Sequence, residues 1–333
     1  MLFFVVCACF ALFPGQVLSG AQNGLALCIN AVIPSLLPFM LLSSCVIKSK
    51  FSRPLGVFLG KVLTPLTGIS PNGCVCLVTG LIGGYGAGAR AVYESFKEGQ
   101  LSKEETERIL PFCNNAGPLF IMGTVGAGLL SDNSLGIMLF FIHTAAALIC
   151  ARVMGGGFKG ERLSLREEWC FYKKNKPPLG KLITSSAIES GGAIINACVF
   201  VITFSAILEI LPFGQYSLTA GILEVTRGAA ELSRKGRGAL PLMSAVLAWG
   251  GMSVHFQASA LTSGELSMKN YYIGLVFGSM VAFLLTRALY ADKYVLLFCL
   301  IVIATAILIG AGIRWIFHPQ YARQPEYRQR QHS

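Results

Sequence analysis

The sequence predicts an all-α polytopic membrane protein with about eight transmembrane helices and two re-entrant hairpins in an inverted-topology repeat. First, 54% of its 333 residues are hydrophobic and only 13% are charged, whereas soluble chains carry about a quarter charged residues. Second, several long stretches lack any formal charge and reach the roughly 20 residues that a membrane-spanning helix needs. Third, Lys and Arg gather in short loops between these stretches, which is the positive-inside pattern.

The net charge of +11 does not indicate a nucleic-acid partner, because no basic stripe carries interleaved aromatic residues. The lipid bilayer is the expected partner. The eleven cysteines are odd in number and lie mostly in apolar stretches, so they predict buried thiols rather than a disulfide framework. No spacing of metal ligands is present, and Cys74 and Cys76 lack a second pair. We expect no metal and no cofactor.

The N-terminal region, residues 1–23, is predicted to be a transmembrane helix whose span covers 1–19. A cleaved signal peptide is the alternative, although no basic residues precede the apolar stretch. With residues 24–47 it forms an out-and-back pair of spans. The following loop, 48–61, carries four positive charges and no negative one, so it is assigned to the cytoplasm.

The remaining spans follow from charge parity. Residues 72–92 are predicted to cross outward, which places 94–108 outside. The strongly basic segment 152–181 belongs in the cytoplasm, so only one of the stretches 110–131 and 133–150 crosses. The Gly-Pro break within PFCNNAGPLF makes 110–131 the re-entrant hairpin, because such backbone needs a buried or wetted niche.

The second half repeats this order with the sides exchanged. Residues 184–211 cross outward, 215–230 return to a cytoplasmic loop at 231–237, and 239–263 form the second re-entrant hairpin. Spans at 271–289 and 294–313 then place both termini in the cytoplasm. The predicted organisation is a first repeat at 24–154, a basic cytoplasmic loop at 155–183, a second repeat at 184–290, a C-terminal transmembrane helix at 291–317 and a basic tail at 318–333.

The two halves share the order of their segments, although their sequence identity is very low. GLIGGYGAGAR in the first half matches GILEVTRGAA in the second, and PFCNNAGPLF matches AWGGMSVHFQ. Inverted repeats with discontinuous segments that meet near the midplane are a recurrent plan of secondary transporters.

Polar residues within the broken stretches are the candidates for a substrate path. Carboxamides both donate and accept hydrogen bonds, which suits a small polar solute. An ionisable residue inside a membrane span is a functional candidate; Glu224 is the strongest, and a structural ion pair with Arg227 is an equal alternative. The candidates are Asn114, Asn115, Gly117, Pro118, Glu224, Arg227, Ser253, His255 and Gln257.

Three further assignments concern residues outside this set of candidates. Gly80, Gly84 and Gly88 recur every four residues and predict a stripe for close helix packing, or a backbone face on the substrate path. Glu189 is interpreted as an interfacial charge and His143 as a packing residue. No nucleophile elbow, Walker motif or paired catalytic carboxylates occur, so the sequence does not predict an enzyme.

Several of these segments resemble the YlbJ-like sporulation integral membrane proteins, within the nucleoside recognition or Gate-domain group of membrane proteins. The resemblance rests on IPSLLPFMLLS, GLIGGYGAGAR, LSKEETERILPFCNNAGPLFIMGTVGAG and SVHFQ, and Cys-Asn-Asn-Ala-Gly-Pro is its most specific part. Ala87 departs slightly from the family pattern. The resemblance implies a multi-pass protein of the cell membrane that is required for endospore formation.

Two functions are expected from these features. The first is a transporter or channel for a small polar solute that binds between the two hairpins. The alternative is a non-transporting scaffold that organises sporulation proteins, with the basic loop 152–181 and the tail 321–333 as docking surfaces. Homo-oligomers are also compatible with the sequence.

Overall fold

The computed structural model describes residues 2–156, 158, 163–214, 216–262 and 264–289, and every regular element among them is helical. The predicted C-terminal helix at 291–317 and the tail at 318–333 lie outside the described residues. The elements are α1 Leu2–Leu12, α2 Pro14–Leu27, η1 Cys28–Val32, α3 Ile33–Lys48, α4 Ser52–Thr67, α5 Pro71–Gly83, α6 Ala87–Lys97, α7 Lys103–Cys113, η2 Leu119–Leu129, α8 Asn133–Met154, α9 Leu165–Asn175, α10 Leu179–Ile210, α11 Ser217–Leu223, α12 Val225–Ser233, η3 Arg237–Ala239, α13 Leu240–Trp249, α14 Gly251–Leu261 and α15 Lys269–Leu289.

Five of the described helices are long and apolar enough to cross a membrane. A sixth is added if α4 and α5, which are bent by 88° at their junction, count as one span. The predicted class of helical membrane protein is therefore confirmed, and the number of eight spans stays a prediction. The five spans are Pro14–Lys48, Asn133–Met154, Leu179–Ile210, Arg237–Leu261 and Lys269–Leu289.

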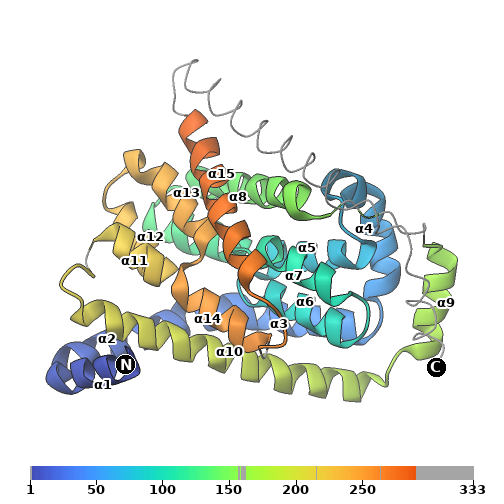
Figure 1. Ribbon diagram of the computed structural model, residues 1–333, viewed down its shortest axis with the longest axis horizontal. Helices are drawn as coiled ribbons and strands as arrows, with labels where there is room; N and C mark the ends of the chain where they lie inside the picture. Colours follow the sequence, from blue (N-terminus) through green and yellow to red (C-terminus); the bar gives the residue numbers. More distant parts are fainter. Residues whose placement is uncertain (1, 157, 159–162, 215, 263, 290–333) are drawn as a thin grey trace.

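A single long helix replaces the predicted pair of spans at 1–19 and 24–47. α2, η1 and α3 continue one another from Pro14 to Lys48 and run antiparallel to α10, with Gly20 against Ala206 at one end and Lys48 against Glu189 at the other. α1 has 11 residues, too few to span a bilayer. It lies at the opposite end of the molecule from α9 (Figure 1), whereas the out-and-back prediction placed the N-terminus beside the loop 48–61.

α5 and α6 form a hairpin that begins and ends on one face. A β-carbon on Gly88 would lie 2.8 Å from the Cα of Gly80, so the two helices fold back onto each other. At the open end the Asn72 amide donates to the Gln100 carbonyl over 3.1 Å. The segment 72–92 therefore does not cross, contrary to the prediction.

α11 and α12 form the second hairpin. They have 7 and 9 residues and meet at Glu224. A β-carbon on Gly228 would lie 2.6 Å from the backbone nitrogen of Gly221, which is the same glycine-on-glycine contact as in the first hairpin. The predicted crossing at 215–230 is thus also a fold-back.

The segments predicted to be re-entrant are broken but do not fold back. α7 and η2 run antiparallel to α8 along its length: Gly126 contacts Gly136 near one end, Ala116 donates to His143 in the middle, and Arg108 contacts Gly156 at the other end. α13 and α14 together form one 25-residue candidate span despite the break at Gly250. The charges of the loops require that one segment in each half does not cross the membrane. The packing of the helices decides that this segment is the hairpin and not the broken span.

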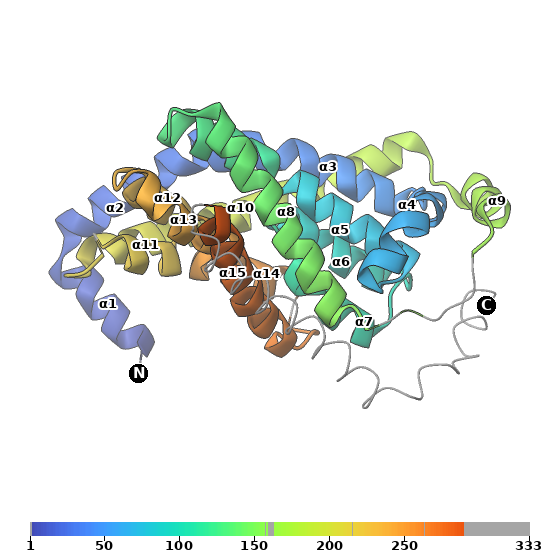
Figure 2. The same cartoon turned by 90° about the horizontal axis from the view of Figure 1, so that it is seen from above.

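Ion pairs assign the loops to two faces of the molecule. Lys50 pairs with Glu98, Arg53 with Glu168 on α9, and Lys97 with Glu265, and we call this end the α9 face. Asp132 pairs with Arg237 over 3.2 Å at the other end, the Asp132 face. Figure 2 shows α9 and α1 at opposite ends. The loop 94–108 therefore shares a face with 48–61, and 231–237 lies opposite them; the prediction had these two loops exchanged.

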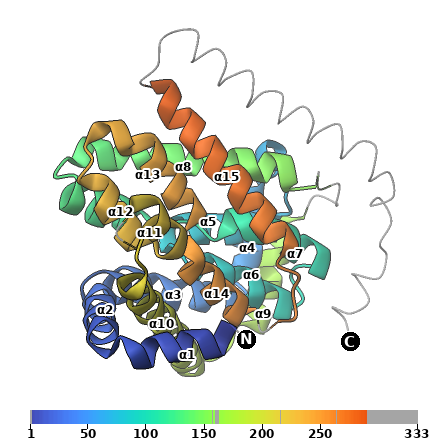
Figure 3. The same ribbon diagram turned by 60° about the vertical axis from the view of Figure 1, so that its left-hand side comes forward.

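The hairpin of α5 and α6 lies inside the bundle. Figure 3 shows α5, α6 and α14 between α2 and α10 on one side and α8, α13 and α15 on the other. One buried cluster joins α5, α6 and α7 to α15, and a second joins η2 and α8 to α12 and α13. Each hairpin is therefore held by apolar contacts to a broken span.

Candidate functional site

Four chain interruptions meet in the interior: the tips of both hairpins and the breaks of both broken spans. Gly84 at the first tip lies against Gly117 in the first break, where a β-carbon on Gly117 would be 3.0 Å from the Cα of Gly84. A β-carbon on Gly250 in the second break would be 3.2 Å from the Tyr85 ring, and one on Gly251 would be 2.9 Å from the nitrogen of Val225 beside the second tip.

Glycine is required at several of these positions by backbone conformation. Gly84 and Gly86 at the first tip have φ of 85° and 76°, and Gly250 and Gly251 have φ of 84° and 80°. This left-handed region is costly for residues with a β-carbon. The predicted glycine stripe therefore divides: Gly80 and Gly88 pack helix against helix, and Gly84 forms the turn.

The two predicted asparagines stabilise the first break. The Asn114 Oδ1 accepts from the backbone nitrogen of Gly86 over 2.8 Å, and its Nδ2 donates to the Tyr271 hydroxyl over 2.8 Å. Asn115 donates to the Phe112 carbonyl over 2.5 Å. Asn114 thus ties the first hairpin tip to α15. Pro118 sits at the start of η2, where its fixed φ suits the first helical turn.

Glu224 is 1% exposed and caps the N-terminus of α12, where its Oε2 accepts from the nitrogen of Arg227 over 2.7 Å. The Arg227 guanidinium instead contacts Glu209 at 3.4 Å and Glu231 at 3.7 Å. The two side chains predicted as an ion pair therefore have separate partners. Glu224 keeps its carboxylate in the interior, beside the helix N-terminus that favours negative charge.

A small central cavity lies at this convergence. It has a volume of about 30 Å³, enough for one or two water molecules. Of the predicted candidates, Gly117, Glu224 and Gln257 line it. The other polar groups in its wall, Ser35, Tyr85 and Thr226, were not predicted from the sequence.

His255 and Ser253 do not line the central cavity. His255 accepts or donates one hydrogen bond with the Trp249 carbonyl at 2.9 Å, and its ring packs against the rings of Trp249, Tyr271 and Tyr272. In this arrangement His255 is a hydrogen-bonded packing residue. Ser253 is fully buried, and its hydroxyl has no hydrogen-bond partner among the described residues.

Over 323 residues the chain is 27% identical to the sporulation integral membrane protein YlbJ of Bacillus subtilis strain 168, and the match covers 84% of this chain and 79% of that protein. This similarity supports the predicted resemblance to the YlbJ-like sporulation integral membrane proteins. No family model matches it, and no solved structure does either.

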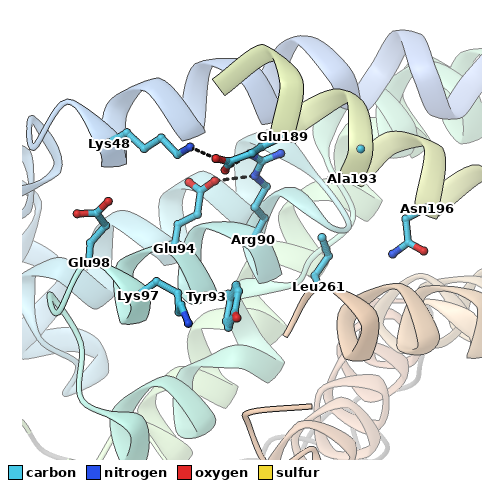
Figure 4. Close-up of a pocket in the computed structure, with 11 residues that line it drawn as sticks. Lys48, Arg90, Tyr93, Glu94, Lys97, Glu98, Glu189, Ala193, Asn196 and Leu261 are labelled. Atoms are coloured by element: carbon cyan, nitrogen blue, oxygen red, sulfur yellow. Dashed lines mark hydrogen bonds and ion pairs between the residues drawn. The ribbon is translucent and has the colours of Figure 1, made fainter. Parts of the chain in front are cut away.

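The YlbJ-like chain also has a larger cavity near the α9 face, which we call the vestibule (Figure 4). Its volume is about 400 Å³, within the range of ligand pockets. Charged side chains from three helices meet at its wall: Lys48 of α3, Arg90 and Glu94 of α6, and Glu189 of α10.

Arg90 is the centre of this charged group. Its Nε donates to Glu94 over 2.7 Å, and its Nη2 lies 3.2 Å from Glu189, which also pairs with Lys48. Arg90 and Glu94 are 5% and 8% exposed. Arg90 was not among the predicted site residues, although a charge embedded in an apolar segment is a signal that could have identified it.

Within the described part of the YlbJ-like chain, no three His, Cys, Asp or Glu side chains are grouped as a metal site would need. The chemistry available at the central cavity is hydrogen bonding from hydroxyl, carboxamide and carboxylate groups. The vestibule adds paired charges of both signs.

Proposed function

We propose that the protein is a transporter or channel for a small polar solute, which binds where the two hairpin tips meet the two helix breaks. The observation that carries this proposal is the convergence of four interrupted segments on one small cavity, whose wall includes the buried polar side chains of Glu224 and Gln257. Backbone interruptions at membrane depth are tolerated where they are packed in protein or line a path.

The arrangement of the halves supports the same proposal. The hairpin of α5 and α6 opens at the α9 face, and each hairpin is followed by a broken span and then by an unbroken one, α8 or α15. The hairpin of α11 and α12 is followed by the Asp132–Arg237 pair on the opposite face. We propose that the two halves form an inverted-topology repeat. Many secondary transporters are built from such repeats.

The cellular setting follows from the relative. YlbJ is a sporulation integral membrane protein, and we assign this chain to endospore formation in the cell membrane. The α9 face carries the loop 48–61 and the basic helix α9, so we place it in the cytoplasm by the positive-inside rule.

The central cavity is too small for a solute larger than water in the described conformation, since its volume is about 30 Å³. A transported solute therefore requires the hairpin tips to separate from the breaks. The closest contacts between tips and breaks include glycine backbone atoms, as where Gly84 lies against Gly117.

A ligand screen tests the proposal. Purified full-length protein is melted with a panel of small polar solutes, and at least one class is expected to raise the melting temperature. Glu224→Gln and Gln257→Ala should weaken that solute's apparent affinity about tenfold to a hundredfold, as expected when a hydrogen bond to a charged or buried group is lost. Glu265→Gln, on the exposed loop before α15, is the matched control and should bind normally.

If the solute raises the melting temperature equally in the parent, Glu224→Gln and Gln257→Ala, the ligand binds elsewhere and the proposal is wrong. Counterflow of the same solute into vesicles containing the protein then separates a transporter from a protein that only binds it.

The scaffold alternative rests on α9. This helix is docked on α4 through the Arg53–Glu168 pair and the contacts of Phe51 with Trp169 and Tyr172, while Lys173 and Lys174 are exposed. A scaffold would lose function when these two lysines are replaced by Gln and would keep it in the Glu224 and Gln257 variants. The docking tail at 321–333 lies outside the described residues.

A further inference from the structure

The vestibule and the central cavity are separated by a layer of apolar side chains. Leu36 of α3, Met40 of α3, Ala87 of α6, and Ala193 and Ile194 of α10 form one buried cluster. Leu36 also lines the central cavity, whereas Ala193 lines the vestibule. Leu261 of α14 packs against the same cluster and lines the vestibule as well. The cluster is thus the wall that both cavities share.

This layer is attached to the tip of the first hairpin. A β-carbon on Gly84 would lie 2.9 Å from a methyl group of Leu36, and one on Gly86 would lie 3.7 Å from the Met40 methyl and 3.9 Å from Leu261. A displacement of the tip therefore moves the side chains that separate the cavities. These side chains are apolar and make no hydrogen bonds of their own, so the layer itself is held by apolar packing.

We propose that this apolar layer is the closed gate of a path that runs from the vestibule to the central cavity. The inference deepens the proposed function, because it names the route by which a polar solute reaches the site from the α9 face. Apolar constrictions exclude water and polar solutes until they widen.

The charged group in the vestibule is placed to hold the gate closed. Lys48 of α3, Arg90 of α6 and Glu189 of α10 join the three helices that supply the gate, and the Ser44 hydroxyl of α3 donates to Glu94 over 3.1 Å. Figure 4 shows the four charged side chains of Lys48, Arg90, Glu94 and Glu189 turned toward one another, with Ala193 and Leu261 beside them. Opening the gate at the α6 side strains these ion pairs.

Thiol accessibility tests the gate without knowledge of the solute. Gln257→Cys places a thiol in the central cavity and Asn196→Cys places one in the vestibule. Full-length protein in vesicles is exposed at its α9 face to a charged methanethiosulfonate reagent, and labelling of each site is timed by mass spectrometry of its peptide. We expect the vestibule thiol to label at least tenfold faster than the central one.

The gate is then widened with Leu36→Ala, with Leu261→Ala and with both. Labelling at position 257 should rise at least tenfold in the double variant, and labelling at 196 should stay within twofold. Leu139→Ala is the matched control: it removes the same side chain from a fully buried position in another cluster and should leave both rates unchanged.

Three outcomes would overturn the gate. These are equal labelling of the two thiols with the gate intact, no rise at 257 when the gate is widened, and an equal rise with Leu139→Ala. Leu261 is only partly buried, so its single variant keeps the test informative if Leu36→Ala impairs folding. A failed solute screen with the accessibility pattern intact would reject the proposed function and leave the gate standing.

Discussion

Gly88 lies against Gly80 so closely that a β-carbon on Gly88 would come within 2.8 Å of the Gly80 Cα. The same substitution would also collide with the Cys113 carbonyl of α7. Gly228 and Gly221 repeat the relationship in the second hairpin. Backbone contact of this kind keeps the two arms of each hairpin together and packs the first of them against a broken span.

Gly88→Ala is expected to destabilise the protein by about 3 kcal/mol or more, at the upper end of overpacking effects, because backbone atoms cannot move aside. Thermal melting of the full-length protein measures the loss. Gly191→Ala on α10 is the control, since nothing lies within 4 Å of a β-carbon there. It should be neutral or stabilising by up to about 1 kcal/mol, the helix-propensity gain. Equal melting temperatures for the two variants would contradict the hairpin.

The second hairpin makes an independent prediction. Gly228→Ala meets Gly221 backbone atoms and should lower the melting temperature about as much as Gly88→Ala. Gly238→Ala, where no atom lies within 4 Å, is the nearby control and should melt like the parent. A Gly228 variant that melts normally would mean that 215–230 is a straight span after all.

Arg90→Met should lower the free energy of unfolding by about 3–5 kcal/mol, because it leaves the Glu94 carboxylate buried without its ion-pair partner. Arg90 and Glu94 side chains are only 6% and 10% exposed. Adding Glu94→Leu removes the unpaired charge and should recover at least half of the loss. Lys97→Ala breaks the exposed Lys97–Glu265 pair and should change melting little. No recovery in the double variant would show that the arginine stabilises mainly through contacts other than this pair.

The loop residue Glu265 makes a prediction about pH. Its pKa is lowered by the hydrogen bond from the Tyr93 hydroxyl and then by Lys97. A lowered pKa stabilises the fold at pH values above the ordinary glutamate pKa, about 4.3, and this contribution is lost as the pH falls through the lowered value. Glu265→Gln should therefore melt slightly below the parent at pH 7, and the difference should close below about pH 4. If the difference in melting temperature between the parent and Glu265→Gln grows as the pH falls, the pKa of Glu265 is not lowered in the folded protein.

Labelling of single introduced cysteines in vesicles checks the assignment of faces. Thiols at Lys61 and Lys103 should react from the same side, and thiols at Asn133 and Arg234 from the other, because the ion pairs group these loops in that way. Opposite labelling of Lys61 and Lys103 would restore 72–92 as a crossing. The comparison of 103 with 234 alone does not discriminate, since both arrangements place these loops on opposite faces.

The sequence by itself determined the class of protein and the location of its interruptions. Charge-free stretches of membrane length identified the helical membrane class, since a bilayer core admits so few charges. Gly, Pro and Asn in PFCNNAGPLF and Gly in AWGGMSVHFQ marked the two breaks, because those residues release the helical backbone. Glu224 was identified correctly as a deep carboxylate, since a charge between apolar neighbours is costly.

Only the tertiary structure decided which interrupted segment folds back and which crosses. Loop charges determine only whether the number of crossings between two charged loops is odd or even. This number does not change if a hairpin and a crossing helix exchange places. The choice depends on glycines that meet across space, Gly80 with Gly88 and Gly221 with Gly228. The pairing of Arg227 with Glu209 and of Arg90 with Glu189 was likewise set by packing, because both glutamates lie on α10 and the arginines lie on other helices.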